Sequence, residues 1–143
     1  MKTVAFVPIR LNSQRVEGKN LRRLGGEPLM CHILETLLRT ERIDEVYVYC
    51  SNEEIRPLLP EGVKLLRRAE ELDRDTTLGR EIYDAFTAEV EADYYVLAHA
   101  TSPFIRPKTI DDALEKVLTG AFDSAFSVEK IQTFAWYEGR PLN

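Results

Sequence analysis

The most informative stretch of this chain is residues 4–24, VAFVPIRLNSQRVEGKNLRRL. It opens with an apolar run, Val4 to Val7, which predicts a buried first strand that ends at Pro8, because proline has no N–H for the sheet ladder. The loop that follows carries five basic residues and one acid, Glu17, in a chain whose formal net charge is −5. Positive charge concentrated directly after the first strand of an acidic chain predicts an anion-binding loop.

Strand and helix patterns alternate outward from this stretch. Aromatic and β-branched runs predict further strands at 45–50, 63–66, 93–98, 124–128 and 133–137. Apolar residues recurring at i and i+4 predict helices at 28–39, 76–90 and 107–119. We expect the strand at 93–98 to be the most buried and Thr76 or Thr77 to cap the second helix. This alternation predicts an α/β fold, a doubly wound and mainly parallel sheet with flanking helices.

The last residues, 140–143, are typical of a turn between two strands. We therefore expect a hairpin whose second strand lies beyond Asn143. On this interpretation residues 1–143 form a single α/β domain that is C-terminally incomplete, the N-terminal part of a longer protein.

Composition excludes several classes of protein. With 44% hydrophobic and 30% charged residues, the chain is typical of a globular domain rather than a disordered segment, and no apolar run approaches the ~20 residues that span a membrane. The acidic net charge argues against a nucleic-acid partner. Cys31 and Cys50 form no CxxC pair, which predicts free thiols in a reducing cytoplasm.

The basic loop after the first strand matches neither common phosphate-binding motif. The chain contains no GxxxxGK[ST] and no GxGxxG. Charge runs are most often solvated surface, but this one sits where parallel sheets bind ligands, at the carboxyl end of a strand. Backbone N–H groups, arginine and lysine together can hold a triphosphate, so we favour a nucleotide-binding loop.

Residues 7–21, VPIRLNSQRVEGKNL, resemble the signature of the CMP-sugar synthetases, the cytidylyltransferases that activate acidic sugars. Their SxRxxGK portion is similar to the branch acting on 3-deoxy-manno-octulosonate. The pair Lys19-Asn20 and residues 100–103, ATSP, resemble the acylneuraminate branch, as does the segment 68–76, RAEELDRDT. The resemblance runs from residue 4 to 128, and it implies a Rossmann-like fold of the nucleotide-diphospho-sugar transferase type.

The resemblance also implies a reaction. The anomeric hydroxyl of a 2-keto sugar acid attacks the α-phosphorus of CTP, and pyrophosphate leaves with Mg²⁺ assisting. Arg10 and Lys19 would be the catalytic residues, because this chemistry depends on positioning and on neutralising phosphate charge. The implied nucleotide-binding residues are Pro8, Ile9, Arg10, Ser13, Gln14, Arg15, Lys19, Asn20, Arg68, Asp75, Thr76 and Thr77. The implied sugar-binding residues are His99, Thr101 and Ser102.

Two positions depart from the family pattern. His99 stands where the acylneuraminate branch has glutamine, and Ser51 stands where related enzymes often have aspartate. The metal ligands and much of the family's dimer-forming segment are expected beyond Asn143. A non-catalytic nucleotide- or sugar-binding module of the same fold, or a nucleotidyltransferase with another base or acceptor, therefore stays open. The expected partners are CTP and an acidic sugar, with a homodimer allowed and no nucleic acid or membrane.

Overall fold

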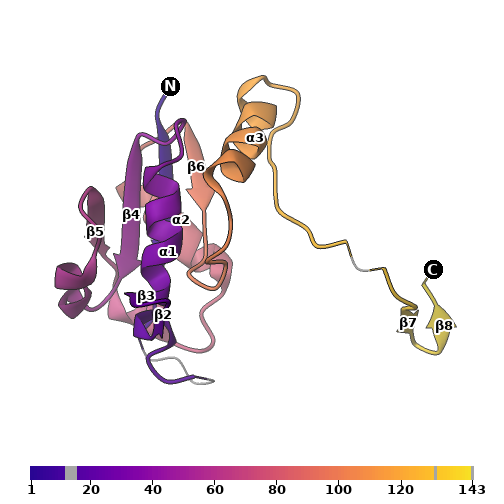
Figure 1. Ribbon diagram of the computed structural model, residues 1–143, viewed down its shortest axis with the longest axis horizontal. Coiled ribbons are helices and arrows are strands. Elements are labelled where there is room, and N and C mark those ends of the chain that lie inside the picture. The colour runs from indigo at the N-terminus through magenta and orange to yellow at the C-terminus, as the bar shows by residue number, and fades with distance from the viewer. Residues whose placement is uncertain (12–15, 131, 143) are drawn as a thin grey trace. The chain divides into compact units, whose positions relative to one another are not determined.

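The computed structural model describes residues 1–11, 16–130 and 132–142. The chain divides into two compact units, Met1–Asp112 and Ala113–Asn143. The first unit is built on a four-stranded sheet in the order β5-β4-β1-β6, and all neighbouring strands pair in parallel (Figure 1). These strands are β1 (Thr3–Pro8), β4 (Glu45–Cys50), β5 (Val63–Arg67) and β6 (Tyr94–Leu97).

Burial differs sharply between the central and outer strands. Every residue of β1 from Thr3 to Val7 is buried, because β1 pairs with β4 on one side and β6 on the other. In β6, Tyr95 and Leu97 are both more than a third exposed. The prediction that 93–98 is the most buried strand is therefore wrong. Among the described residues β6 is an edge strand, and its aromatic, apolar sequence does not reveal that position.

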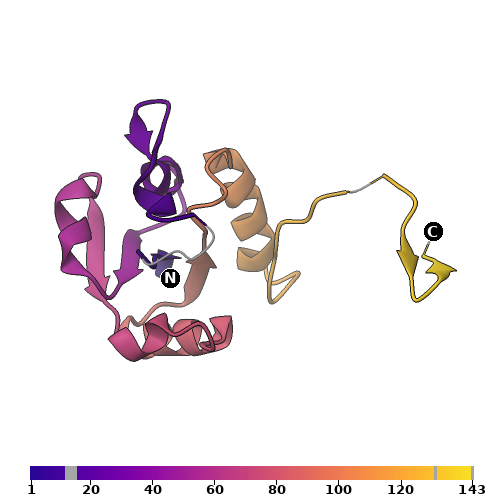
Figure 2. The same cartoon turned by 90° about the horizontal axis from the view of Figure 1, so that it is seen from below.

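Two helices cover opposite faces of the sheet (Figure 2). Successive side chains of a strand point to opposite faces. Ala5 and Val7 belong to the cluster that contains the buried residues of α1 (Leu29–Leu38). Val4 and Phe6 belong to the cluster around Phe86 of α2 (Gly79–Glu89). This arrangement confirms the predicted doubly wound α/β fold.

The start of α2 differs from the prediction. The helix begins at Gly79, and the Leu78 N–H donates a 2.6 Å hydrogen bond to Glu81 Oε2. The N-cap residue is Leu78, and a glutamate in the first turn accepts from its amide. The prediction of a threonine cap is wrong, because both threonines lie in the turn before the helix.

Short elements fix the segments between the strands. The strands β2 (Arg23–Leu24) and β3 (Glu27–Pro28) form a hairpin, which His32 of α1 holds through a 2.8 Å hydrogen bond to the Leu24 carbonyl oxygen. Three 3₁₀ helices complete the first unit, η1 (Lys19–Leu21), η2 (Glu53–Leu58) and η3 (Glu70–Asp73).

In the last part of the chain the structure differs from the sequence prediction at two places. Helix α3 (Pro107–Leu118) forms as predicted, but no strand forms at 124–128, where the Phe126 side chain is 85% exposed. Alternating apolar residues make a strand only where they find a pairing edge, and the sequence does not supply that information. Strand β7 (Trp136–Tyr137) pairs with β8 (Arg140–Pro141), so the hairpin's second strand lies within the chain and not beyond it. Among the described residues no helix is long and apolar enough to cross a bilayer.

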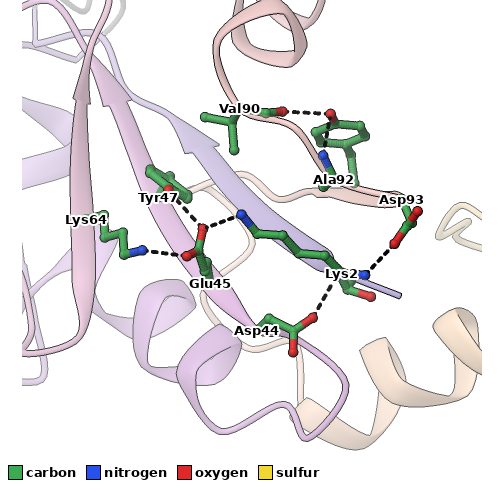
Figure 3. Close-up of polar contacts among 10 residues, drawn as sticks. Lys2, Asp44, Glu45, Tyr47, Lys64, Val90, Ala92 and Asp93 are labelled. Atoms are coloured by element: carbon green, nitrogen blue, oxygen red, sulfur yellow. Dashed lines mark hydrogen bonds and ion pairs between the residues drawn. The ribbon is translucent and has the colours of Figure 1, made fainter.

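A polar network closes the sheet at the N-terminal ends of its strands (Figure 3). Glu45 accepts hydrogen bonds from Lys64 Nζ at 2.6 Å and from the Tyr47 hydroxyl at 2.9 Å, and it forms an ion pair with Lys2 at 3.1 Å. The hydrogen bond from Lys64 is the main reason that the pKa of Glu45 is lowered to about 2. Ion pairs and hydrogen bonds to Glu45 therefore link β4 to β5 and to Lys2, the residue before β1, at this end of the sheet.

Candidate functional site

The carboxyl ends of the four parallel strands meet at one edge of the sheet, where open α/β sheets bind their ligands. A cleft of about 220 Å³ lies there, between the segment after β1 and the segment after β6. Its lining residues are Pro8, Arg10, Lys19, Asn20, His99, Ala100 and Thr101. The structure thus joins two sequence motifs that lie some eighty residues apart.

Arg10 extends from the end of β1 toward the segment after β5. Its Nη1 atom donates to the Asp75 carboxylate and to the Asp73 main-chain carbonyl oxygen, each at 2.9 Å. The Arg10 side chain is 33% exposed and Asp75 is 57% exposed, so water screens this ion pair. A guanidinium has five N–H donors, and both bonds come from a single nitrogen.

Lys19 and Asn20 are positioned by the tight return of the loop after β1. Gly18 takes a left-handed conformation with φ of +60°, which glycine adopts without strain, and the 3₁₀ helix η1 begins directly after it. The Asn20 side-chain amide donates a 3.1 Å hydrogen bond to the main-chain oxygen of Arg10. This bond closes the loop and sets Lys19 and Arg10 on the same cleft.

His99 and Thr101 enter the cleft from the end of β6. The Ala98 N–H donates to the Phe6 carbonyl oxygen at 3.1 Å, which extends the β1–β6 pairing up to this point. The next residues form a turn, in which the Ser102 N–H donates to the His99 carbonyl oxygen at 3.0 Å. Ala100 is buried beneath the turn, whereas His99 and Thr101 are exposed to the cleft.

Arg68 lies under the site. Its side chain is only 2% exposed and forms an ion pair with Asp73. Its Nη2 atom also donates a 3.2 Å hydrogen bond to the Ile9 carbonyl oxygen, and its guanidinium lies 5.7 Å from the centre of the Tyr49 ring. Because Ile9 directly precedes Arg10, this buried cation supports the backbone from which Arg10 extends.

Burial also sets the electrostatics beside Arg68. Burial, followed by the nearby Glu89 carboxylate, raises the pKa of Tyr49 to about 12. Burial likewise raises the pKa of the Cys50 thiol. Both groups are therefore neutral at physiological pH.

The predicted site residues fall into three groups. The cleft brings together Pro8, Arg10, Lys19, Asn20, His99 and Thr101. The residues that are described but are not among its lining residues are Ile9, Arg68, Asp75, Thr76, Thr77 and Ser102. Ser13, Gln14 and Arg15 lie outside the described residues. Asp73, which contacts both Arg10 and Arg68, was not predicted as a site residue, although it lies within the segment 68–76 that resembles the acylneuraminate branch.

The described residues do not by themselves form a metal cage. Within residues 1–11, 16–130 and 132–142, no group of three or more histidine, cysteine, aspartate or glutamate side chains lies close enough to hold an ion. Mg²⁺ usually binds one or two carboxylates together with substrate phosphates, so a protein cage is not its usual site in such chemistry. That the reaction uses Mg²⁺ stays a prediction.

Sequence comparisons identify relatives across most of the chain. The family model described as cytidylyltransferase matches residues 4–138. N-acylneuraminate cytidylyltransferase A of Danio rerio is 29% identical over 136 residues, which cover 94% of this chain and 32% of that protein. The 3-deoxy-manno-octulosonate cytidylyltransferase of Chlorobium phaeobacteroides is 33% identical over 120 residues, which cover 83% of this chain and 47% of that protein.

A solved structure agrees with the sequence comparisons. CMP:2-keto-3-deoxy-manno-octonic acid synthetase, complexed with CTP, superposes with a TM-score of 0.74 at 25% identity, covering 85% of this chain and 49% of that one. The chain thus spans about a third to a half of the length of these proteins.

Proposed function

The chain belongs to the cytidylyltransferase family, and from this premise we propose that the protein transfers CMP from CTP to an acidic 2-keto sugar. The sugar hydroxyl oxygen attacks the α-phosphorus, the bond from that phosphorus to the bridging oxygen breaks, and pyrophosphate leaves with the electron pair. The hydroxyl proton passes to solvent or to a base. The products are a CMP-sugar and pyrophosphate.

The observation that carries this proposal is the shared cleft. Arg10 and Lys19 line it from one side, and His99 and Thr101 line it from the other. A triphosphate bound along the cationic side would place its α-phosphorus near the side from which an acceptor can approach. At about 220 Å³ the cleft is smaller than the roughly 300–1,000 Å³ of whole-ligand pockets, so we assign it to the phosphates rather than to the whole of CTP.

We assign roles to the cleft residues on chemical grounds. Arg10 and Lys19 neutralise the triphosphate and then the leaving pyrophosphate. Such electrostatic stabilisation is the main contribution of a protein to this kind of transfer. Asn20 holds the loop that carries both cations. His99 and Thr101 are polar groups available to the sugar acid.

The proposal also includes the other assignments that the family resemblance implies. They are cytosine recognition by Pro8, Ile9, Arg68, Asp75, Thr76 and Thr77, phosphate contacts from Ser13, Gln14 and Arg15, and sugar contact from Ser102. Mg²⁺ enters the proposal as the companion of the triphosphate and not as an ion held by the described residues. The homodimer, the lack of nucleic-acid and membrane partners and the cytoplasmic setting also stay predictions.

The test is pyrophosphate release by the full-length protein. CTP and Mg²⁺ would be mixed with an acylneuraminic acid, a legionaminic-type acid and 3-deoxy-manno-octulosonic acid in separate assays. We expect release with CTP and one class of acid. Arg10→Ala should abolish pyrophosphate release. The matched control is Arg23→Ala, which should retain release, because Arg23 is an exposed arginine of the same basic segment and does not line the cleft.

Two outcomes would replace the proposal. Release with UTP or GTP but not with CTP would assign another base to the site. Tight CTP binding without release in the presence of every acid would favour a non-catalytic binding module of the same fold.

A further inference from the structure

Asp73 connects the segments that follow three neighbouring strands. Its carboxylate accepts a hydrogen bond from the Ser51 hydroxyl, after β4, and forms an ion pair with Arg68, after β5. Its main-chain carbonyl oxygen accepts a 2.9 Å hydrogen bond from Arg10 Nη1, after β1. One residue at the end of η3 therefore ties together the carboxyl ends of β1, β4 and β5.

The link to Arg68 is the anchor of this arrangement. Arg68 is 2% exposed, and a buried cation without an anion is strongly unfavourable. Its other hydrogen bond, to the Ile9 carbonyl oxygen, comes from a neutral group. Within the described part of the chain, Asp73 provides the carboxylate that forms an ion pair with Arg68. Segment 70–75 is held against the sheet by that pair.

We propose that Asp73 is a positioning residue for nucleotide binding, which holds Arg10 in place where it lines the cleft. The inference rests on the proposed function, because only there does Arg10 receive a triphosphate. The Asp73 side chain fixes its own backbone to Arg68 and Ser51, and that backbone then holds one nitrogen of the Arg10 guanidinium. A cation held in this way needs no reorganisation when phosphate binds.

Asp75 does not provide an equivalent anchor. Its ion pair with Arg10 has the same 2.9 Å length, but the Asp75 side chain is 57% exposed, and pairs that water reaches hold their partners weakly. The Asp73 side chain is 23% exposed and its partner Arg68 is buried. The contact of Arg10 that is backed by a buried ion pair is therefore the one to Asp73.

The experiment measures steady-state kinetics of the full-length protein with Asp73→Asn. This change keeps the shape of the side chain and removes the charge that holds Arg68. We expect KM for CTP to rise about 10-fold or more, because small displacements of a positioning group have effects of this size. We expect KM for the sugar acid to stay within about twofold, because His99 and Thr101 lie across the cleft.

The matched control is Glu70→Gln, which makes the same chemical change in the same 3₁₀ helix. Glu70 pairs with the exposed Arg67 at 3.8 Å and is not a partner of Arg68 in the described contacts. The KM of the Glu70→Gln variant for CTP should therefore match that of the wild type. A second readout is coupling. Arg10→Ala should weaken CTP binding at least 10-fold in the wild-type chain but less than threefold in the Asp73→Asn chain, because Arg10 has already lost its orientation.

The outcomes separate this inference from the proposed function. If the wild-type protein binds no CTP, both fail. If the wild type is active and Asp73→Asn lowers only kcat, or behaves as Glu70→Gln does, the positioning role alone is overturned. If Asp73→Asn does not fold, Ser51→Ala decides the matter, since it loosens the same carboxylate and leaves the ion pair in place. It should raise KM for CTP about threefold, and an unchanged KM would reject the inference.

Discussion

Glu45→Gln should remove a stabilising charge that the folded chain keeps down to low pH. The carboxylate accepts from Lys64 and Tyr47 and pairs with Lys2 (Figure 3). These contacts lower the pKa of Glu45 from 4.5 to about 2 in the folded protein. The unfolded chain therefore takes up this proton at higher pH than the folded chain does. The stabilisation is complete above pH 4.5 and is lost as the pH falls toward 2.

The exposure of the partners limits the size of the effect. A shift from 4.5 to about 2 would correspond to roughly 3 kcal/mol if it acted in full. The Lys2 and Lys64 side chains are 44% and 52% exposed, so solvent screens both ion pairs. Surface pairs of this kind contribute up to about 1 kcal/mol. We therefore expect the charge of Glu45 to add about 1 kcal/mol to the free energy of unfolding at pH 7.

Urea denaturation of the wild type and of Glu45→Gln, at pH 7 and at pH 2, tests this reasoning. The wild type should be more stable by about 1 kcal/mol at pH 7, and the difference should almost vanish at pH 2. High salt should reduce the difference at pH 7. Glu61→Gln, an exposed glutamate outside the network, is the control and should show no pH-dependent difference. An equal difference at both pH values would refute the electrostatic explanation.

Two further predictions concern the core. Phe86→Ala should lower the free energy of unfolding by about 3–5 kcal/mol, because Phe86 is fully buried and stacks on Phe6 at a centroid distance of 4.1 Å. A urea titration measures this loss, and a loss below about 1 kcal/mol would contradict the packing. Cys31 and Cys50 are buried, and burial raises the pKa of both thiols. A thiol reagent at about pH 7.5 should therefore label them far more slowly in the native chain than in urea. Equal labelling rates would argue against their burial.

The sequence was sufficient for the fold class, because the apolar patterns of the strands and helices agree with the faces that they bury. The apolar run Val4–Val7 predicts β1, and its alternation supplies both faces, Ala5 and Val7 to the α1 side and Val4 and Phe6 to the α2 side. What the pattern lacked was the position of each strand within the sheet. Residues 93–98 are as apolar as a central strand but form the edge strand β6, and residues 124–128 have a strand pattern without a described partner.

The part of the candidate site that was predictable is the part whose residues belong to short sequence motifs. Arg10, Lys19 and Asn20 come from one motif and His99 and Thr101 from another, and strand ends of a parallel sheet meet at one edge. The role of Asp73 was not predictable, because it depends on Arg68 being buried and on the Ser51 hydroxyl facing the same carboxylate. Residue types in a polar loop do not report which of them reach the core.

CTP titration of the full-length protein tests the central claim most directly, that the cationic segment after β1 holds the triphosphate. Calorimetry would compare the wild type with Arg10→Ala, Lys19→Ala and the exposed control Arg23→Ala. We predict that each of the first two changes weakens CTP binding by about 1.5–3 kcal/mol, which is the range for hydrogen bonds to charged groups, and that the control binds normally. Wild-type affinity in both Arg10→Ala and Lys19→Ala would contradict the account.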